Sequence, residues 1–178
     1  MSMLLGRSQS TPHHQLLSMV ARAAVTCMLA LLVTGGEAAA ADPEAQRLLV
    51  KGCLTGDLKL VKTALGSGAS INETWGTNLP LYYAAGKNQV EAVRFLLTSG
   101  ADINGRSGVA QRSALHEAAL RGHFDVVRML VEARASINIR NTHGRSPLYY
   151  VTSPPFPLTK PANAEVIAKY LIAHGGTL

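Results

Sequence analysis

The chain has 178 residues, which allows one ordinary domain, and 47% of them are hydrophobic. Its 17 Lys and Arg outnumber its 11 Asp and Glu, so the formal net charge is +6. No two basic residues are adjacent, so the sequence lacks the basic runs that bind nucleic acid, and we expect no nucleic-acid partner.

Residues 1–40 have the pattern of a signal peptide. Arg7 and Arg22 precede any acidic residue, a twelve-residue apolar run extends from Ala23 to Thr34, and small residues lead up to Ala40. This order predicts export with cleavage after Ala40. As a helix the run would rise about 18 Å, short of a hydrocarbon core of about 30 Å, so we expect no stable membrane span. An uncleaved anchor and a later start codon remain open alternatives.

Residues 41–178 form the predicted domain once the leader is removed. Cys53 is then the one remaining cysteine, so no internal disulfide can form even in an oxidising compartment. Arg7, Arg22 and Glu37 leave with the leader, and the net charge changes from +6 to +5. This charge favours acidic partners or anionic surfaces only weakly.

An internal repeat dominates the domain. The line SALHEAALRGHFDVVRMLVEARASIN at 113–138 closely matches an earlier line, LPLYYAAGKNQVEAVRFLLTSGADIN, at 79–104. Partial copies begin at Gly56 and Ser146. A period of about 33 residues predicts a solenoid of stacked helix pairs. The approximate units are 42–73, 74–106, 107–140 and 141–178.

Local signals within the repeat predict two helices per unit. Ser113 and Ser146 stand where a hydroxyl caps a first helix, and Pro80 and Pro147 fall in its first turn. The second helix carries an apolar stripe that only a neighbouring unit can bury. The stripe consists of Val93, Leu96 and Leu97 in one unit and Val126, Val127, Leu130 and Val131 in the next.

The turn after each second helix favours glycine because its backbone is left-handed. Gly68, Gly100 and Gly175 occupy that position, whereas the third unit has Arg134. If Arg134 keeps the same turn, its positive φ costs about 1 kcal/mol.

These lines resemble the ankyrin repeat, whose pattern runs T-P-L-H-x-A-A, G-H, V-V-x-L-L and G-A-D-x-N, over residues 42–178. The resemblance implies an all-α solenoid of about four helix-turn-helix units with short β-hairpin tips. The last unit departs from the pattern: after Thr152 it reads SPPFPLTKPAN, which predicts an extended loop between two helices. A polyproline ligand at Pro154 to Pro161 is the alternative interpretation.

Motifs for catalysis or cofactor binding are missing from the sequence. His116 and Glu117 begin like the zinc-protease helix H-E-x-x-H, but Leu120 stands where the second histidine belongs. We interpret His116 and His123 as structural and Cys53 as a buried, inert thiol. We therefore expect neither catalysis nor a cofactor nor a metal. A metal-dependent enzyme or factor using His116, His123, His143 or Cys53 is the alternative from another functional class. A purely structural module without a partner in the groove is the third.

Protein binding is the function that the resemblance implies, through the concave face made by the tips and the first helices. The expected tips are 73–78, 105–112 and 139–145, and their candidate contact residues are Trp75, Arg106, Arg112, Arg140, His143 and Arg145. Candidates on the first helices are Tyr83, Lys87, Glu117, Arg121 and Tyr150, whereas Tyr82 and Tyr149 are interpreted as structural. The alternative for the tips is an ordinary solvated surface.

With the leader, the resemblance is to small exported bacterial ankyrin-repeat proteins, and it implies a monomer in the periplasm or outside the cell. Its expected partner is an envelope enzyme such as a catalase. A toxin effector, held by an immunity-type inhibitor, is the second candidate.

Overall fold

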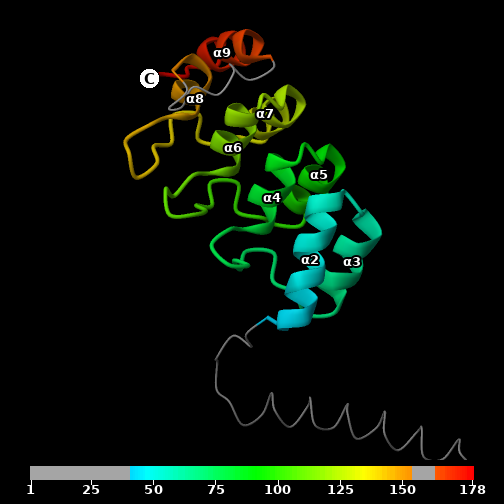
Figure 1. Cartoon of the computed structure of the whole chain (residues 1–178). Coiled ribbons are helices and arrows are strands. Elements are labelled where there is room, and N and C mark those ends of the chain that lie inside the picture. Colours follow the sequence, from blue (N-terminus) through cyan, green and yellow to red (C-terminus); the bar gives the residue numbers. More distant parts are fainter. Residues whose placement is uncertain (1–40, 154–162) are drawn as a thin grey trace, which may run out of the picture. The chain divides into compact units, whose positions relative to one another are not determined.

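The computed structural model describes residues 41–153 and 163–178, and within these ranges the chain forms helices and no named strand. Figure 1 shows the helices along the chain. They are α2 (Pro43–Thr55), α3 (Leu58–Gly66), α4 (Pro80–Gly86), α5 (Val90–Thr98), α6 (Ala114–Arg121), α7 (Phe124–Glu132), α8 (Pro147–Thr152) and α9 (Ala164–Ala173). The expectation of an all-helical repeat fold is confirmed.

Consecutive helices pack in pairs, and the pairs stack on one another (Figure 1). The pairs are α2 with α3, α4 with α5, α6 with α7, and α8 with α9. The first helices of neighbouring pairs contact each other in the order α2, α4, α6, α8, and the second helices do so in the order α3, α5, α7, α9. Each pair therefore touches mainly its neighbours, as a solenoid requires.

The predicted helix starts are confirmed. The Oγ atoms of Ser113 and Ser146 accept hydrogen bonds from the main-chain N–H groups of the third residues of α6 and α8. Pro80 and Pro147 are the first residues of α4 and α8, where a missing N–H leaves no intrahelical bond unmade. A cap of this kind contributes about 1 kcal/mol.

The stripe of the second helices forms the core. Val93, Leu96, Val126 and Leu130 have no exposed surface, and Leu97 is half-buried. Burying each such side chain contributes about 1.5–3 kcal/mol relative to leaving it in water. Because neighbouring units supply the covering atoms, no single unit gains this stabilisation alone.

The left-handed turns also follow the prediction. The φ angles of Gly68, Gly100 and Gly175 are 97°, 91° and 87°. Arg134 keeps the same turn with a φ of 69°, although it carries a Cβ atom. The third unit therefore retains the backbone of its neighbours at a conformational cost.

Asparagine side chains join the turns at Gly100, Arg134 and Gly175 to the unit before each of them. Asn72 Oδ1 accepts from the N–H of Asp102 at 2.7 Å, and its Nδ2 donates to the carbonyl of Gly100 at 3.0 Å. Asn138 makes the equivalent pair with the N–H of Thr177 and the carbonyl of Gly175, at 2.7 and 2.8 Å. These side chains complete main-chain bonding at the seams between units.

Asn104 occupies the equivalent position before the third turn. Its Oδ1 accepts from the N–H of Ser136 at 2.8 Å, but its Nδ2 makes no bond within the described residues. The missing acceptor is the carbonyl of Arg134, the residue that replaces glycine.

The tips are less regular than the expected β-hairpins. An isolated antiparallel bridge joins Trp75 to Asn78 in the first tip, and another joins Ser107 to Arg112 in the second. The third tip is closed by the N–H of Asn141 bonding to the carbonyl of Arg145 at 3.1 Å. Such short loops satisfy their polar groups by turns, without forming a ladder of strand pairs.

Two expectations concern residues that lie outside the described ranges: the signal peptide at 1–40 and the proline-rich loop after Thr152. Among the helices of 41–153 and 163–178, none has the length and apolar character needed to cross a bilayer.

Candidate functional site

A pocket of about 300 Å³ lies between α4 and α6, and we call it the α4–α6 pocket. It brings together five residues that the sequence nominated from separate segments. Its lining residues are Leu54, Asn78, Tyr82, Tyr83, Gly86, Lys87, Arg112, Glu117 and Arg121. The end of α2, two tips and two first helices contribute to it, so three neighbouring units build one surface.

Glu117 is the centre of this pocket. Its side chain is only 4% exposed, and both carboxylate oxygens are bonded. Oε2 accepts from the hydroxyl of Tyr82 at 2.7 Å and lies 3.3 Å from Nη2 of Arg112. Oε1 accepts from Nε of Arg121 at 2.9 Å. A buried carboxylate is stable only with such partners, so Glu117 holds the floor of the pocket together.

Gly86 allows this close packing. A Cβ atom built on Gly86 would lie 3.1 Å from Cγ of Glu117, closer than side chains normally approach. The glycine at the end of α4 therefore leaves room for the α6 carboxylate.

Arg112 links two units through its side chain. Nη2 donates to the hydroxyl of Tyr82 at 2.8 Å, and the guanidinium carbon lies 5.9 Å from the ring centre of Tyr82 and 6.0 Å from that of Tyr150. Burial opposes its charge, yet Glu117 and Tyr82 together raise the pKa of the guanidinium. Burial, with the Glu117 carboxylate, also raises the pKa of Tyr82. The pocket thus contains a charged Arg112 and a neutral Tyr82 at ordinary pH.

Tyr82 is a pocket residue for which the sequence suggests only a structural role. The signal that could have found it is the repeat itself. Tyr82 and His116 occupy equivalent positions in successive units, so Glu117, the residue after His116, falls opposite Tyr82. The tyrosine hydroxyl then lies within reach of the carboxylate.

Two nominated residues are too buried to be contacts. Tyr150 is 2% exposed, because its ring packs edge-on against His116 and its hydroxyl accepts from Nδ2 of Asn141 at 2.8 Å. The expectation that Tyr150 faces an open groove is therefore corrected. Glu117 lines the pocket but is already fully paired. Tyr149, by contrast, is half-buried beneath Arg145, whose guanidinium carbon lies 5.0 Å from its ring centre.

The remaining candidate contact residues lie on the tips, outside the α4–α6 pocket. Arg106 and Arg140 are exposed, but their guanidinium groups donate to main-chain oxygens: Arg106 to Arg140 at 2.7 Å, and Arg140 to Gly144 at 2.6 Å. His143 is exposed at the third tip. These two arginines therefore stabilise the tips by hydrogen bonds to the main chain, although they also face solvent.

Trp75 lies next to the pocket. The residue is 36% exposed, and its carbonyl accepts from the hydroxyl of Tyr83 at 3.0 Å. Tyr83 therefore connects the first tip to the pocket wall.

The candidate nucleophile and histidines have structural surroundings. Burial raises the pKa of the Cys53 thiol to about 12, which keeps it protonated and unreactive. Burial lowers the pKa of His116 to about 4. Nδ1 of His116 accepts from the N–H of Ser113 at 3.1 Å, so the ring proton resides on Nε2 and points to the carbonyl of Arg145 at 3.0 Å. Nε2 of His123 lies 3.2 Å from the carbonyl of Gly86.

Metal binding has no cluster to support it in the described part of the chain. Over 41–153 and 163–178, no group of three or more His, Cys, Asp or Glu side chains is placed to hold an ion.

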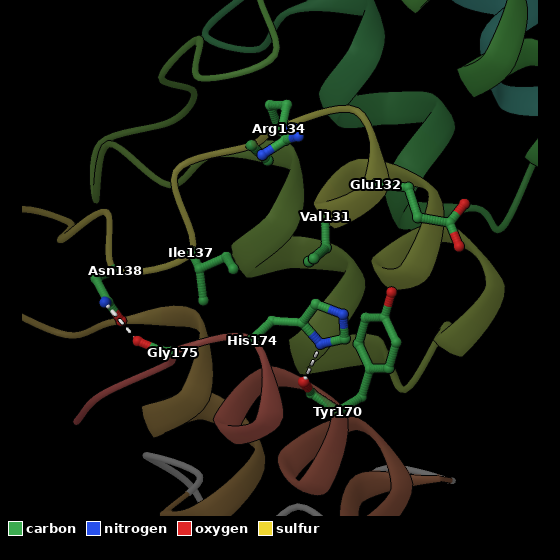
Figure 2. A pocket seen from close by; sticks show the side chains of 9 residues that line it. Val131, Glu132, Arg134, Ile137, Asn138, Tyr170, His174 and Gly175 are labelled. Carbon is green, nitrogen blue, oxygen red and sulfur yellow. Dashed lines mark hydrogen bonds between the residues drawn. The ribbon is translucent and has the colours of Figure 1, made fainter.

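A second pocket, of about 590 Å³, lies between the ends of α7 and α9, and we call it the α7–α9 pocket (Figure 2). Tyr170 and His174 stack in it with ring centres 4.2 Å apart. Glu132 and Arg134 also line it, and neither makes an ion pair within the described residues. Since its charges have both signs, charge complementarity does not select a ligand class here.

The comparisons with known proteins agree with this architecture. A family model described as ankyrin repeats (many copies) matches residues 49–97, 81–131 and 115–153, more than half of the chain. Ankyrin repeats are modules of protein–protein interaction and are generally not catalytic.

Curated relatives that match part of this chain are much longer proteins. The BRCA1-associated RING domain protein 1 of Caenorhabditis elegans is 33% identical over 101 residues, which cover 57% of this chain and 14% of the relative. The ankyrin repeat and SOCS box protein 16 of Homo sapiens is 37% identical over 99 residues, 56% of this chain and 20% of the relative. The ankyrin repeat and KH domain-containing protein mask of Drosophila melanogaster is 35% identical over 103 residues, 57% of this chain and 3% of the relative.

The chain thus spans at most a fifth of the length of these relatives. The stacked helix pairs, the glycine turns and the matched family model lead to one conclusion: the chain belongs to the ankyrin-repeat family.

Proposed function

We propose that the chain is an exported bacterial protein whose ankyrin stack binds another protein in the periplasm, with no catalysis of its own. The observation that carries this proposal is the α4–α6 pocket. It gathers Tyr83, Lys87 and Arg121 beside Trp75. Aromatic and arginine side chains beside a partly enclosed pocket are typical of the residues that dominate protein interfaces.

Export is supported by the sequence of residues 1–40. The proposed partner is accordingly an envelope protein that the stack supports or regulates, and a periplasmic catalase is one concrete form. The absence of a disulfide-forming cysteine pair from residues 41–178 is compatible with folding in an oxidising compartment.

Fractionation tests the location. The protein is recovered from the osmotic-shock, cytoplasmic and membrane fractions of its own host, and its amino terminus is sequenced. The proposal predicts a chain beginning at Ala41 or Asp42 in the shock fluid. An intact amino terminus in the cytoplasm would contradict export, and one in the membrane would indicate an anchor.

Capture tests the binding surface. Tagged wild-type protein, Tyr83→Ala and Ile172→Ala are expressed in the host and recovered from the envelope fraction. Ile172→Ala is the matched control because Ile172 is an exposed apolar residue on α9, outside the α4–α6 pocket. The expected result is a protein that wild type and Ile172→Ala retain and Tyr83→Ala loses. Equal retention by all three would remove the pocket from the interface.

A further inference from the structure

We infer that the partner inserts a carboxylate side chain, from an acidic segment, into the α4–α6 pocket. This inference rests on the proposed function and names the chemistry of the bound segment. The observation behind it is that several N–H donors of cationic side chains have no partner in the described residues, although the Glu117 carboxylate beside them already accepts hydrogen bonds at both oxygens.

The donors can be counted atom by atom. Lys87 is exposed at the end of α4, and its ammonium group makes no hydrogen bond or ion pair within the described residues. Arg121 uses only Nε, on Glu117, and Arg112 uses only Nη2, so the other guanidinium nitrogens of both have no partner in that part of the chain. Nε of Arg112 is buried without an acceptor.

Among the described residues that line the pocket, Glu117 is the one carboxylate that could neutralise these groups, and it is occupied. Each oxygen of Glu117 already accepts from a neighbouring side chain. Three cationic side chains and one carboxylate therefore leave the pocket with a net positive charge.

Charge and geometry then select the occupant. A carboxylate can pair with a guanidinium and an ammonium group at once, and such charge-assisted bonds are about twice as strong as neutral ones. A neutral or basic segment would leave the cations unpaired on desolvation. The volume of about 300 Å³ lies at the lower limit of ligand pockets, which suits one or two side chains of a docked segment.

The aromatic wall adds contact area. Tyr83 is half-buried, and its hydroxyl is bonded to Trp75, so its ring is held in place before binding. A fixed ring contributes apolar contact at little entropic cost. The methylene groups of a glutamate entering the pocket would pack against it.

The chain's own segments are poor candidates for this role. Outside the described residues the sequence contains a single acidic residue, Glu37. Residues 1–40 and 154–162 therefore offer no segment with several carboxylates, and we assign the acidic segment to another protein.

Titration with defined peptides tests the inference. The probes are two fluorescent twelve-residue peptides, one alternating glutamate with serine and one alternating glutamine with serine. Binding to the full protein is measured by anisotropy at low and at physiological salt. We expect the glutamate peptide to bind at least about tenfold more tightly, and equal binding of the two would overturn the inference.

Matched variants distinguish binding in the pocket from attraction of the peptide by the overall positive charge of the protein. Lys59 is, like Lys87, an exposed lysine without a partner in the described residues, but it lies on α3 and outside the pocket. Lys87→Gln and Arg121→Gln are expected to weaken glutamate-peptide binding about fivefold each, and Lys59→Gln by less than twofold. Similar losses in all three would mean that overall charge attracts the peptide and would overturn the inference.

Capture in the host distinguishes this inference from the proposal beneath it. A partner lost with both Tyr83→Ala and Lys87→Glu supports both. A partner lost with Tyr83→Ala but kept by Lys87→Glu preserves the pocket as the interface and overturns the carboxylate anchor. A partner kept by both variants overturns the pocket as the interface and, with it, the carboxylate anchor.

Discussion

Arg134 shows how a single residue can depart from the repeat while its backbone does not. Three of the four turns use glycine, and the fourth keeps a positive φ with an arginine side chain that has no partner in the described part of the chain. The neighbouring units fix the turn, so the residue adopts a conformation that it disfavours. The positive φ lowers the stability of the fold, and replacing Arg134 with glycine should remove this cost.

Arg134→Gly is therefore expected to raise the free energy of unfolding by about 1 kcal/mol. Urea unfolding at pH 7 measures it. The reverse control is Gly100→Ala, where a Cβ atom meets nothing within 4 Å but φ is 91°, so a loss of similar size is expected from strain alone. If Arg134→Gly left stability unchanged or lowered it, its side chain would be making a stabilising contact.

His116 is a buried histidine whose bonds require the neutral ring. Its pKa is about 4 in the folded protein, against 6.5 for an unperturbed histidine. Between these values the unfolded chain binds the proton and the folded chain does not. The associated stability is therefore fully present above pH 6.5 and is lost as the pH falls toward 4.

Because the pKa of His116 is lower in the folded than in the unfolded chain, its titration should lower the free energy of unfolding by roughly 3 kcal/mol between pH 7 and pH 4. Denaturant unfolding at both values, compared with His116→Gln, isolates the effect from the carboxyl groups that titrate in the same range. The variant should lose about 3 kcal/mol less than wild type does. A loss of the same size in both proteins would show that His116 is protonated in the fold.

At the scale of elements, the seams between units differ in a way that the sequence pattern does not reveal. All three asparagines occupy the same repeat position, yet Asn72 and Asn138 each make two bonds to the next turn, whereas Asn104 makes one in the described residues. The turn containing Arg134 is the one that loses a bond.

Asn72→Ala and Asn138→Ala should each cost about 2 kcal/mol of unfolding free energy, and Asn104→Ala about 1 kcal/mol, since one hydrogen bond contributes about 1 kcal/mol. The three variants are compared by urea unfolding under identical conditions. Equal losses would contradict the unequal seams.

The sequence predicts the elements well because capping, turn and packing signals recur at the same positions. Ser113, Pro80 and Gly100 each perform the local role that their residue type suggests. The tips are predicted less well, because a short loop can close with one bridge or with several. The expected exposure of Tyr150 is wrong, since His116 and Asn141, from other segments, cover it.

The candidate site, too, could be predicted only in part, because its contacts come from several segments. The repeat places Tyr82, Arg112 and Glu117 in neighbouring units, and five nominated residues meet in one pocket. The sequence could not show which cations remain unpaired. Arg106 and Arg140 bond to main-chain oxygens whose positions depend on the tip backbone, whereas Lys87 remains unpaired in the described residues.

At the scale of the whole domain, binding and stacking depend on each other. The α4–α6 pocket takes its walls from α2, α4, α6 and two tips, so no single unit contains it. A partner that occupies the pocket binds only the stacked form and stabilises that form by mass action. The central claim is that a protein docks at this surface.

Site-specific photo-crosslinking tests that claim most directly. A benzophenone amino acid is placed at position 78, which lines the pocket, and separately at position 169, an exposed position on α9, in the protein expressed in its own host. The account predicts a discrete adduct with another envelope protein from position 78 and none from position 169. No adduct from position 78, or the same adducts from both positions, would contradict it.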